Sequence, residues 1–261
     1  MTTQAAVVHQ RSQGHVRLEV GKSGLVRLRE QGAAKLRMPT GGHEAILINT
    51  GGGFAGGDEF HFDIEAGEGS NLVTTTQAAE RVYRSLGPPA KIATKLQVGA
   101  AASLCWLPQE TILFDGSSLS RSLEADVAED ASFLAVEPLI LGRAAMGETV
   151  RNATFHDRWR IRRAGRLIHA DDLAFTGKPP ATPATLGDAA ALASILLVSP
   201  EAEATLDRVR GLIGNAGGAS AWNGKLIARL LAKDGFALRK VLCPVLCVVM
   251  GGAPLPKAWS S

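Results

Sequence analysis

Cysteine is scarce in this chain, with three residues among 261. An odd count argues against a disulfide framework and fits a reducing compartment. The six histidines are dispersed and form no H-x-H or H-x-x-x-H pair, so the sequence indicates no tight structural zinc site. We therefore expect a protein held together by its core rather than by disulfides or a structural metal.

Long hydrophobic runs are also missing. The longest apolar run, around Val241 to Met250, is too short to span a bilayer. The first residues, Met1-Thr2-Thr3-Gln4, lack the charged and apolar regions of a signal peptide. Together with the cysteine count, these absences predict a soluble cytoplasmic protein without a membrane partner.

Neither sign of charge dominates. The chain has 28 basic and 25 acidic residues, a net charge of +3, and its basic residues are scattered. Bulk charge therefore makes no case for a nucleic-acid partner. With 46% hydrophobic and 20% charged residues, the composition is that of an ordinary globular protein with a sizeable core.

Motifs of the common hydrolases and phosphate-binding enzymes are absent: there is no G-x-S-x-G, H-E-x-x-H or G-K-[ST] sequence. Cys243 and Cys247 are spaced i, i+4 on an expected helix, a geometry that could hold a soft metal. They lie among valine and leucine, where cysteine more often packs as a small hydrophobe. We therefore predict no catalytic residue and assign no metal site.

Glycine, by contrast, is concentrated at one place. Five of the seven residues 51–57 are glycine, directly after an apolar run, and they include a G-x-G-x-x-G match. A dinucleotide site would need a helix next, with its N-terminus at the pyrophosphate. Residues 60–64 instead alternate as a strand. A strand-to-strand corner closed by Asp58 is favoured, and an enzyme or binding protein that uses the 51–57 corner for a nucleotide or small ligand is the alternative.

Two adjoining blocks carry a more specific pattern. Residues 47–58 fit Leu-x-Asn-x-x-Gly-Gly-x-x-Gly-Gly-Asp, and residues 75–85 fit Thr-Thr-Gln-x-Ala-x-(Arg/Lys)-x-Tyr-Arg-Ser. With further blocks at 106–110, 141–148, 218–220 and 255–259, the chain resembles the UreD (UreH) family of urease accessory proteins from about residue 15 to residue 259. The residues we take as the structural motif are Gly52, Gly53, Gly56, Gly57, Gln77, Tyr83 and Arg84.

The resemblance implies a non-enzymatic scaffold that joins UreF and UreG on apo-urease and conducts nickel to the urease active site. Carboxylates would suit a transient Ni²⁺ ion, because oxygen ligands exchange where thiolates would trap it. We expect Asp58 to be the best-placed member of such a passage, with Glu80, Glu137 and Asp171 as weaker candidates. Each could equally be a loop cap or salt-bridge partner.

A spaced repeat indicates the fold. Small-residue turns end at Ser70, Ser103 and Ser132, which lie 33 and 29 positions apart, and an alternating strand precedes each turn. The pattern alone leaves two architectures open, stacked β-helix-like layers or a meander of hairpins. The resemblance favours the layers. We therefore predict a mainly β protein with layered, β-helix-like sheets and a single domain over residues 1–261.

The remaining segments complete this prediction. Residues 31–43 lose their alternation and are expected to be loop or irregular strand, whereas 222–231 is expected to be a strand. Arginines alternate along 158–162, on a face that is more often solvated than ligand-binding. Helices are expected only in the C-terminal third, from Ser199-Pro200 to Gly214 and over 238–249, the second with Pro244 inside it.

Overall fold

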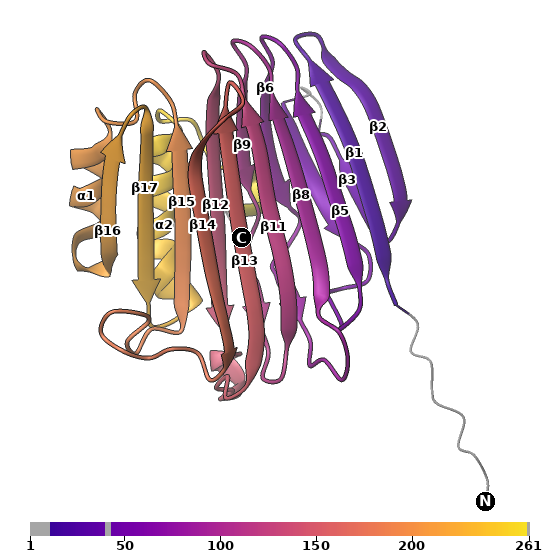
Figure 1. The fold of residues 1–261 in the computed structure, drawn as a ribbon, viewed down its shortest axis with the longest axis vertical. Helices are drawn as coiled ribbons and strands as arrows, with labels where there is room; N and C mark the ends of the chain where they lie inside the picture. Colours follow the sequence, from indigo (N-terminus) through magenta and orange to yellow (C-terminus); the bar gives the residue numbers. More distant parts are fainter. Residues whose placement is uncertain (1–10, 40–42, 260–261) are drawn as a thin grey trace, which may run out of the picture.

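The computed structural model describes residues 11–39 and 43–259. The prediction about Met1 to Gln4 lies outside these residues, and the single domain over 1–261 stays a prediction. Two sheets face each other, with two helices near one end (Figure 1). The first sheet, sheet A, has the order β14-β13-β11-β8-β5-β1-β2. Its strands are β1 (Gln13–Gly21), β2 (Gly24–Gly32), β5 (Glu59–Ala66), β8 (Ala90–Val98), β11 (Ser118–Val127), β13 (Ala153–Arg163) and β14 (Arg166–Gly177).

The second sheet, sheet B, has the order β16-β17-β15-β12-β9-β6-β4-β3, and the short strands β7 and β10 extend it beside β12. Its strands are β3 (Ala34–Arg37), β4 (Glu44–Asn49), β6 (Asn71–Thr76), β7 (Glu80–Val82), β9 (Ser103–Leu107), β10 (Thr111–Leu113), β12 (Ser132–Leu141), β15 (Ala191–Val198), β16 (Gly217–Trp222) and β17 (Lys225–Ala232). The helices are α1 (Leu206–Ile213) and α2 (Gly235–Val249), with short 3-10 turns at Ala144–Met146, Gly214–Ala216 and Lys257–Trp259.

The repeat predicted from the serine spacing is a stack of coils. Strands β5, β8, β11 and β13 pair in parallel in sheet A, and β6, β9 and β12 do so in sheet B. The turns stack too, because the Ser103 amide donates to Ser70 O (2.8 Å) and the Ser132 amide to Ala102 O (3.0 Å). Successive coils are therefore neighbours in both sheets, which confirms the layered architecture over the hairpin meander.

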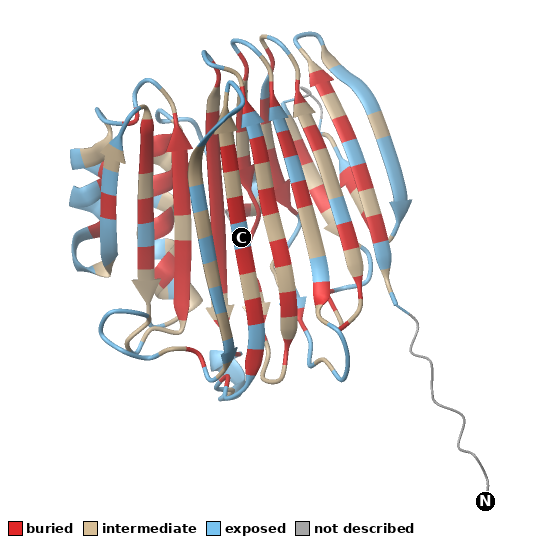
Figure 2. Ribbon diagram, viewed as in Figure 1, coloured by how far each residue is buried: buried red, intermediate tan, exposed pale blue. Residues whose placement is uncertain are grey.

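The main core lies between the sheets. Side chains alternate along the inner strands of sheet A, so every second residue points inward, as the striped pattern of burial in Figure 2 shows, whereas the edge strand β2 is mostly exposed. One inward row crosses five strands, and each of its members is at most 2% exposed: Leu18, Ile64, Leu96, Ala125 and Ile161. The outward rows are polar. Arg158 pairs with Glu124 (3.3 Å) and Arg160 with Asp172 (2.6 Å), so the alternating arginines form cross-strand ion pairs.

A second core lies on the outer face of sheet B. Helices α1 and α2 pack there against β15, β17 and β16 (Figure 1), so β12 and β15 are buried on both faces and read as continuous apolar runs. Leu242, Val245 and Leu246 of α2 are completely buried in this core. No helix within residues 11–39 and 43–259 is long and apolar enough to cross a membrane.

Three local predictions hold only in part. Residues 34–37, expected to be loop or irregular strand, form the strand β3. The strand expected over 222–231 is β17, which begins only at Lys225, because Asn223 (φ +52°) and Gly224 (φ +71°) supply the two left-handed residues of a tight turn after β16. Helix α1 begins only at Leu206, because the Thr205 hydroxyl bonds the carbonyls of Glu201 and Ala202 and holds the preceding residues in turns.

Helix α2 starts three residues earlier than expected. The Asp234 carboxylate caps it by accepting a hydrogen bond from the Ala237 amide (2.7 Å). The helix continues through Pro244 to Val249.

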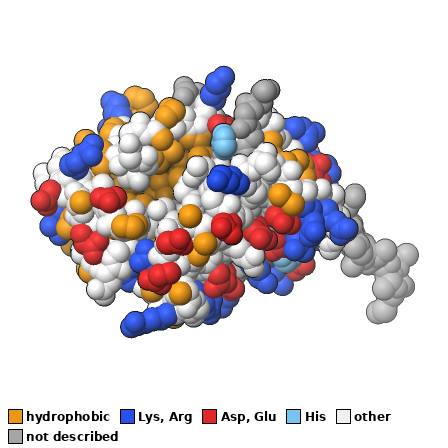
Figure 3. All heavy atoms as spheres, turned by 90° about the horizontal axis from the view of Figure 1, so that it is seen from above, with side chains coloured by type: hydrophobic (Ala, Val, Ile, Leu, Met, Phe, Trp, Pro, Cys, Tyr) orange, Lys and Arg blue, Asp and Glu red, His pale blue; other side chains and the backbone are white. Residues whose placement is uncertain are grey.

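One end of the coil stack carries a group of acidic side chains. Seen from the end where the β5–β6, β8–β9 and β11–β12 turns lie, acidic side chains gather along one side of a partly apolar surface (Figure 3). The connections at this end carry one lysine, Lys22, and the acids Glu68, Glu129, Asp130, Glu201 and Glu203. The opposite end carries the glycine-rich corner and the longer loops that surround the site described below.

The core makes a direct stability prediction. Leu104 on β9 is 0% exposed, so Leu104→Ala should lower the free energy of unfolding by about 2–5 kcal/mol, the range for a cavity left in a rigid core. Leu86 is 85% exposed, and Leu86→Ala should change it by less than about 0.5 kcal/mol. Denaturant unfolding of both variants measures the difference. Equal effects would contradict the placement of the core.

Candidate functional site

Sheet B is interrupted along one line that crosses several coils. Ser103 lies opposite Ser132, but Thr111 lies opposite Leu139, so the chain between β9 and β10 has one residue more than the facing part of β12. The chain from β6 to β7 has one residue more than the facing chain from β9 to β10. Thr75 lies opposite Leu107, but Glu80 lies opposite Thr111. Such bulges are frequent next to functional sites, where they redirect side chains.

Side chains take over the backbone hydrogen bonding along this line. The Gln109 amide donates to Thr76 Oγ1 (2.9 Å), and that hydroxyl donates to Ala78 O (3.0 Å). In the neighbouring coil, Asn49 Nδ2 donates to Gly53 O (3.0 Å). The bulged segments are therefore fixed in place, although they lack a regular ladder.

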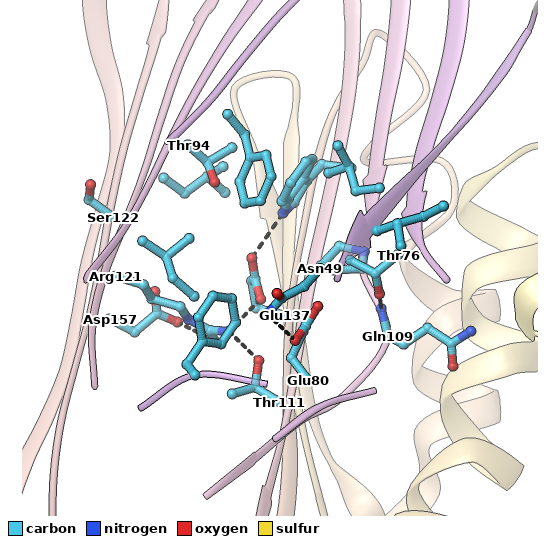
Figure 4. Close-up of a pocket in the computed structure, with 18 residues that line it drawn as sticks. Asn49, Thr76, Glu80, Thr94, Gln109, Thr111, Arg121, Ser122, Glu137 and Asp157 are labelled. Atoms are coloured by element: carbon cyan, nitrogen blue, oxygen red, sulfur yellow. Dashed lines mark hydrogen bonds and ion pairs between the residues drawn. The ribbon is translucent and has the colours of Figure 1, made fainter. Parts of the chain in front are cut away.

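A cavity lies between the two sheets behind the bulges (Figure 4). The cavity has a volume of about 50 Å³, enough for about three water molecules. Apolar side chains such as Phe62 and Leu123 form much of its wall. The polar residues that line it come from both sheets and from the bulges: Asn49, Thr76, Glu80, Thr94, Gln109, Thr111, Arg121, Ser122, Glu137 and Asp157.

A buried ion-pair chain joins the sheets at this cavity. Arg121 on β11 donates through Nη1 to Glu137 Oε2 (2.6 Å) on β12 and through Nη2 to Asp157 Oδ2 (2.7 Å) on β13. Tryptophan indoles donate to the other carboxylate oxygens, Trp106 to Glu137 (2.9 Å) and Trp159 to Asp157 (3.2 Å). All three charged side chains are at most 8% exposed. Burial raises the pKa of Glu137 despite the opposing effect of Arg121.

Glu80 is the second carboxylate of the cavity. It begins β7 at the bulge, and its Oε2 accepts a hydrogen bond from Asn49 Nδ2 (3.2 Å). Burial outweighs this bond and raises the pKa of Glu80 to about 7. Figure 4 shows the Glu80 and Glu137 side chains pointing into the same space. A group of this kind can exchange a proton or a cation near neutral pH.

The structure brings two of the four expected acids together and places the other two elsewhere. Asp58 closes the glycine-rich corner: its Oδ1 accepts from the Ser12 amide (2.8 Å) and its Oδ2 from the Ala55 amide (2.7 Å). Asp171 lies on β14 and pairs with Arg229 on β17, at the side of the molecule where sheet A ends. Neither residue lines the cavity.

The glycines of the corner serve close packing. Gly53 has φ +140°, and a Cβ there would lie 2.6 Å from Arg81 O. A Cβ on Gly56 would lie 2.8 Å from Pro88 O, and Gly57 has φ +86°. Strand β5 follows the corner directly, so the strand–turn–helix arrangement of a dinucleotide site is not formed here.

The second motif block packs on the first. Tyr83 donates its hydroxyl hydrogen to Gly52 O (2.9 Å), and the Gln77 amide donates to Leu47 O (2.8 Å). The backbone of Arg84 forms an isolated antiparallel β-bridge with Ser117. The Arg84 side chain packs closely on Gly116, where an added Cβ would lie 2.9 Å from it. The two blocks that carry the resemblance therefore form one structural unit around Asn49 and Glu80.

The C-terminal segment closes the outer side of the bulge. Trp259 Nε1 donates to Leu107 O (3.1 Å), and Gln109 Nε2 donates to Ala258 O. Arg239 of α2 donates to Gln109 Oε1 (2.5 Å) and forms a two-pronged ion pair with Glu110 (2.6 and 2.9 Å). The blocks at 106–110 and 255–259, distant in sequence, thus meet at the outer side of the bulge, and the first of them also lines the cavity.

The cysteines show no metal geometry. Within the described residues, no group of three or more histidine, cysteine or acidic side chains could hold a metal ion. Burial raises the pKa of Cys243, which keeps its thiol protonated at neutral pH. Cys243 packs in the second core, as expected of a small hydrophobe.

Sequence reasoning missed Arg121 and Asp157. The sequence did contain an indication of this buried pair, because each charged residue occupies an inward-facing position of an alternating strand. Arg121 stands between Leu119 and Leu123 on β11, and Asp157 stands between Phe155 and Trp159 on β13. A charge at an inward position of a half-buried strand needs a buried partner, and the two register neighbours supply it to each other.

Comparisons with known proteins match nearly the whole chain. The family model described as UreD urease accessory protein matches residues 12–260. A relative from Rhizobium leguminosarum bv. viciae, named urease accessory protein UreD, is 48% identical, with both chains covered completely. Relatives of the same name from Agrobacterium fabrum and Brucella suis are 45% and 47% identical, covering 98% and 94% of this chain and 94% and 91% of theirs.

The pKa of Glu80 predicts a pH dependence of stability. The folded chain holds this proton up to about pH 7, whereas the unfolded chain releases it near its ordinary value of 4.5. Folding stability therefore falls as pH rises between these values. Above about pH 7, Glu80→Gln should be more stable than the parent by about 1–3 kcal/mol, with a flatter pH curve.

Denaturant unfolding across this pH range measures the effect. Glu59→Gln, which removes an outer-face carboxylate paired with Lys91, is the matched control and should follow the parent curve. Parallel curves for the parent and Glu80→Gln would show that Glu80 is solvated.

Proposed function

Because the chain belongs to the UreD family of urease accessory proteins, we propose that it acts in urease maturation as a non-enzymatic scaffold and nickel conduit. The observation that carries the proposal is the cavity between the sheets, where Glu80 and Glu137 face one space behind a fixed break in sheet B. A cavity lined by the carboxylates of Glu80, Glu137 and Asp157 and by apolar walls suits the passage of a cation better than chemistry on an organic substrate.

Carboxylate ligands suit a metal ion that must be released again. Ni²⁺ binds imidazole and thiolate sites tightly, whereas carboxylate and water ligands exchange more readily. The cavity has room for about three waters, so a six-coordinate ion would keep part of its hydration shell and take its other ligands from the protein.

In this proposal the chain assembles with UreF, UreG and apo-urease in the cytoplasm, and nickel released from UreG passes between the two sheets. Asp171 would extend the passage towards the side where β14 faces β17. Asp58 would act at a distance, by fixing the corner that positions Asn49. For the alternative, a nucleotide or small ligand on the 51–57 corner, we find no supporting feature, because packing accounts for its glycines.

The test is urease activation in cells that express urease with its accessory proteins. Omission of this chain should leave urease nickel-poor and inactive. Glu80→Gln and Glu137→Gln remove one charge each at nearly constant shape, and each should lower urease activity and nickel content by at least about tenfold, the effect of about 1.4 kcal/mol on one step. Pull-down of the complex checks that assembly is retained.

Glu59→Gln on the outer face of sheet A is the control and should activate urease fully. Full activation without the chain would refute the maturation role. Full activation by both cavity variants would refute the conduit and leave the scaffold.

A further inference from the structure

Arg121 poses a question that a simple acidic passage does not answer. Its guanidinium is only 8% exposed and lies between two carboxylates at the cavity, where a fixed positive charge opposes the entry of a cation. It also carries an unused donor, because Arg121 Nε is buried and meets no acceptor within the described residues. A donor of this kind calls for an acceptor such as water, which the cavity has room to hold.

We propose that Arg121 competes with the cation for Glu137. Without the ion, Arg121 is paired with Glu137. When the ion binds, Glu137 turns to the ion and Arg121 stays paired with Asp157. This proposal rests on the nickel conduit proposed above and assigns the residue that keeps binding weak. Arg121 is thus a positioning residue, and Glu80 and Glu137 are the groups that touch the ion.

The hydrogen bonds allow this exchange without unfolding the site. If Glu137 turns its Oε2 from Arg121 to a cation, its Oε1 still accepts from Trp106 (2.9 Å). Arg121 keeps Asp157 Oδ2 (2.7 Å) and Thr111 Oγ1 (3.1 Å). Asp157 is itself oriented by Trp159 (3.2 Å). Both partners of the broken pair therefore remain anchored, so the change is confined to one contact.

The charges balance in the loaded state. A divalent cation with ionised Glu80 and Glu137 is neutral, and so is Arg121 with Asp157. The ion and the guanidinium compete for one carboxylate, so the free energy of breaking the Arg121–Glu137 pair is subtracted from that of binding. A site with this competitor releases its cargo more readily than the same carboxylates would alone.

The experiment is a titration of the purified chain with Ni²⁺ alone, in which binding is measured by calorimetry or equilibrium dialysis. The decisive variant is Arg121→Gln with Asp157→Asn, which removes one positive and one negative charge and so preserves the net charge. We expect this double variant to bind nickel at least about tenfold more tightly than the parent. Asp157→Asn alone, which leaves Arg121 free to hold Glu137, should bind no more tightly than the parent.

Arg121→Lys tests the mechanism by rescue, since it keeps a cation beside Glu137 and should bind nearly as weakly as the parent. Unfolding curves confirm that each variant is folded at the temperature of titration. An unchanged or weaker affinity in the double variant would overturn the proposal, as would equal tightening by Asp157→Asn alone or an absence of nickel binding in every protein.

Urease activation separates this proposal from the conduit. If Glu80→Gln fails to activate urease but the double variant binds nickel no more tightly, the conduit stands and the competitor role is wrong. If urease is activated fully by Glu80→Gln and Glu137→Gln, the conduit itself is wrong.

Discussion

The ion pair between Arg121 on β11 and Glu137 on β12 connects the two sheets at the cavity that interrupts the apolar packing between them. Elsewhere the sheets are held apart by interdigitating side chains such as Leu96 and Leu104, which specify distance but little else. A buried charge specifies both a partner and an orientation, because leaving it unpaired is costly. The cavity therefore has a defined position, and its polar atoms have defined directions.

The rest of the site follows from the way the coils are built. A parallel stack repeats its hydrogen bonds from coil to coil, so a regular stack would place a seamless sheet where the cavity now is. The bulges at 76–79 and 107–110 interrupt that sheet. There the Thr76 hydroxyl accepts from the Gln109 backbone amide and donates to Ala78 O, and Arg239 holds the Gln109 side chain from outside. Regular coils supply rigidity, and the irregular line makes room for the cavity.

The sequence allowed the coils to be predicted but only part of the site. Turns ending at Ser70, Ser103 and Ser132 predicted a repeated strand–turn–strand unit, and the family resemblance was needed to choose stacked layers over a meander of hairpins. The hairpin at Asn223 was missed because its turn residues were read as strand. Glu80 and Glu137 meet through register shifts of single residues, which no pattern of hydrophobicity reveals. Asp58 lies outside the cavity, because its carboxylate fixes the glycine-rich corner.

The stepwise lengthening of successive coils has a consequence for how such proteins diversify. Each coil contacts only its neighbours, so gain or loss of one residue at the 76–79 or 107–110 segment alters the interior locally and leaves the turns at either end in register. The width of the space between the sheets is thus a property that insertions and deletions can adjust one coil at a time. Relatives would be expected to differ in length here before they differ in the apolar rows.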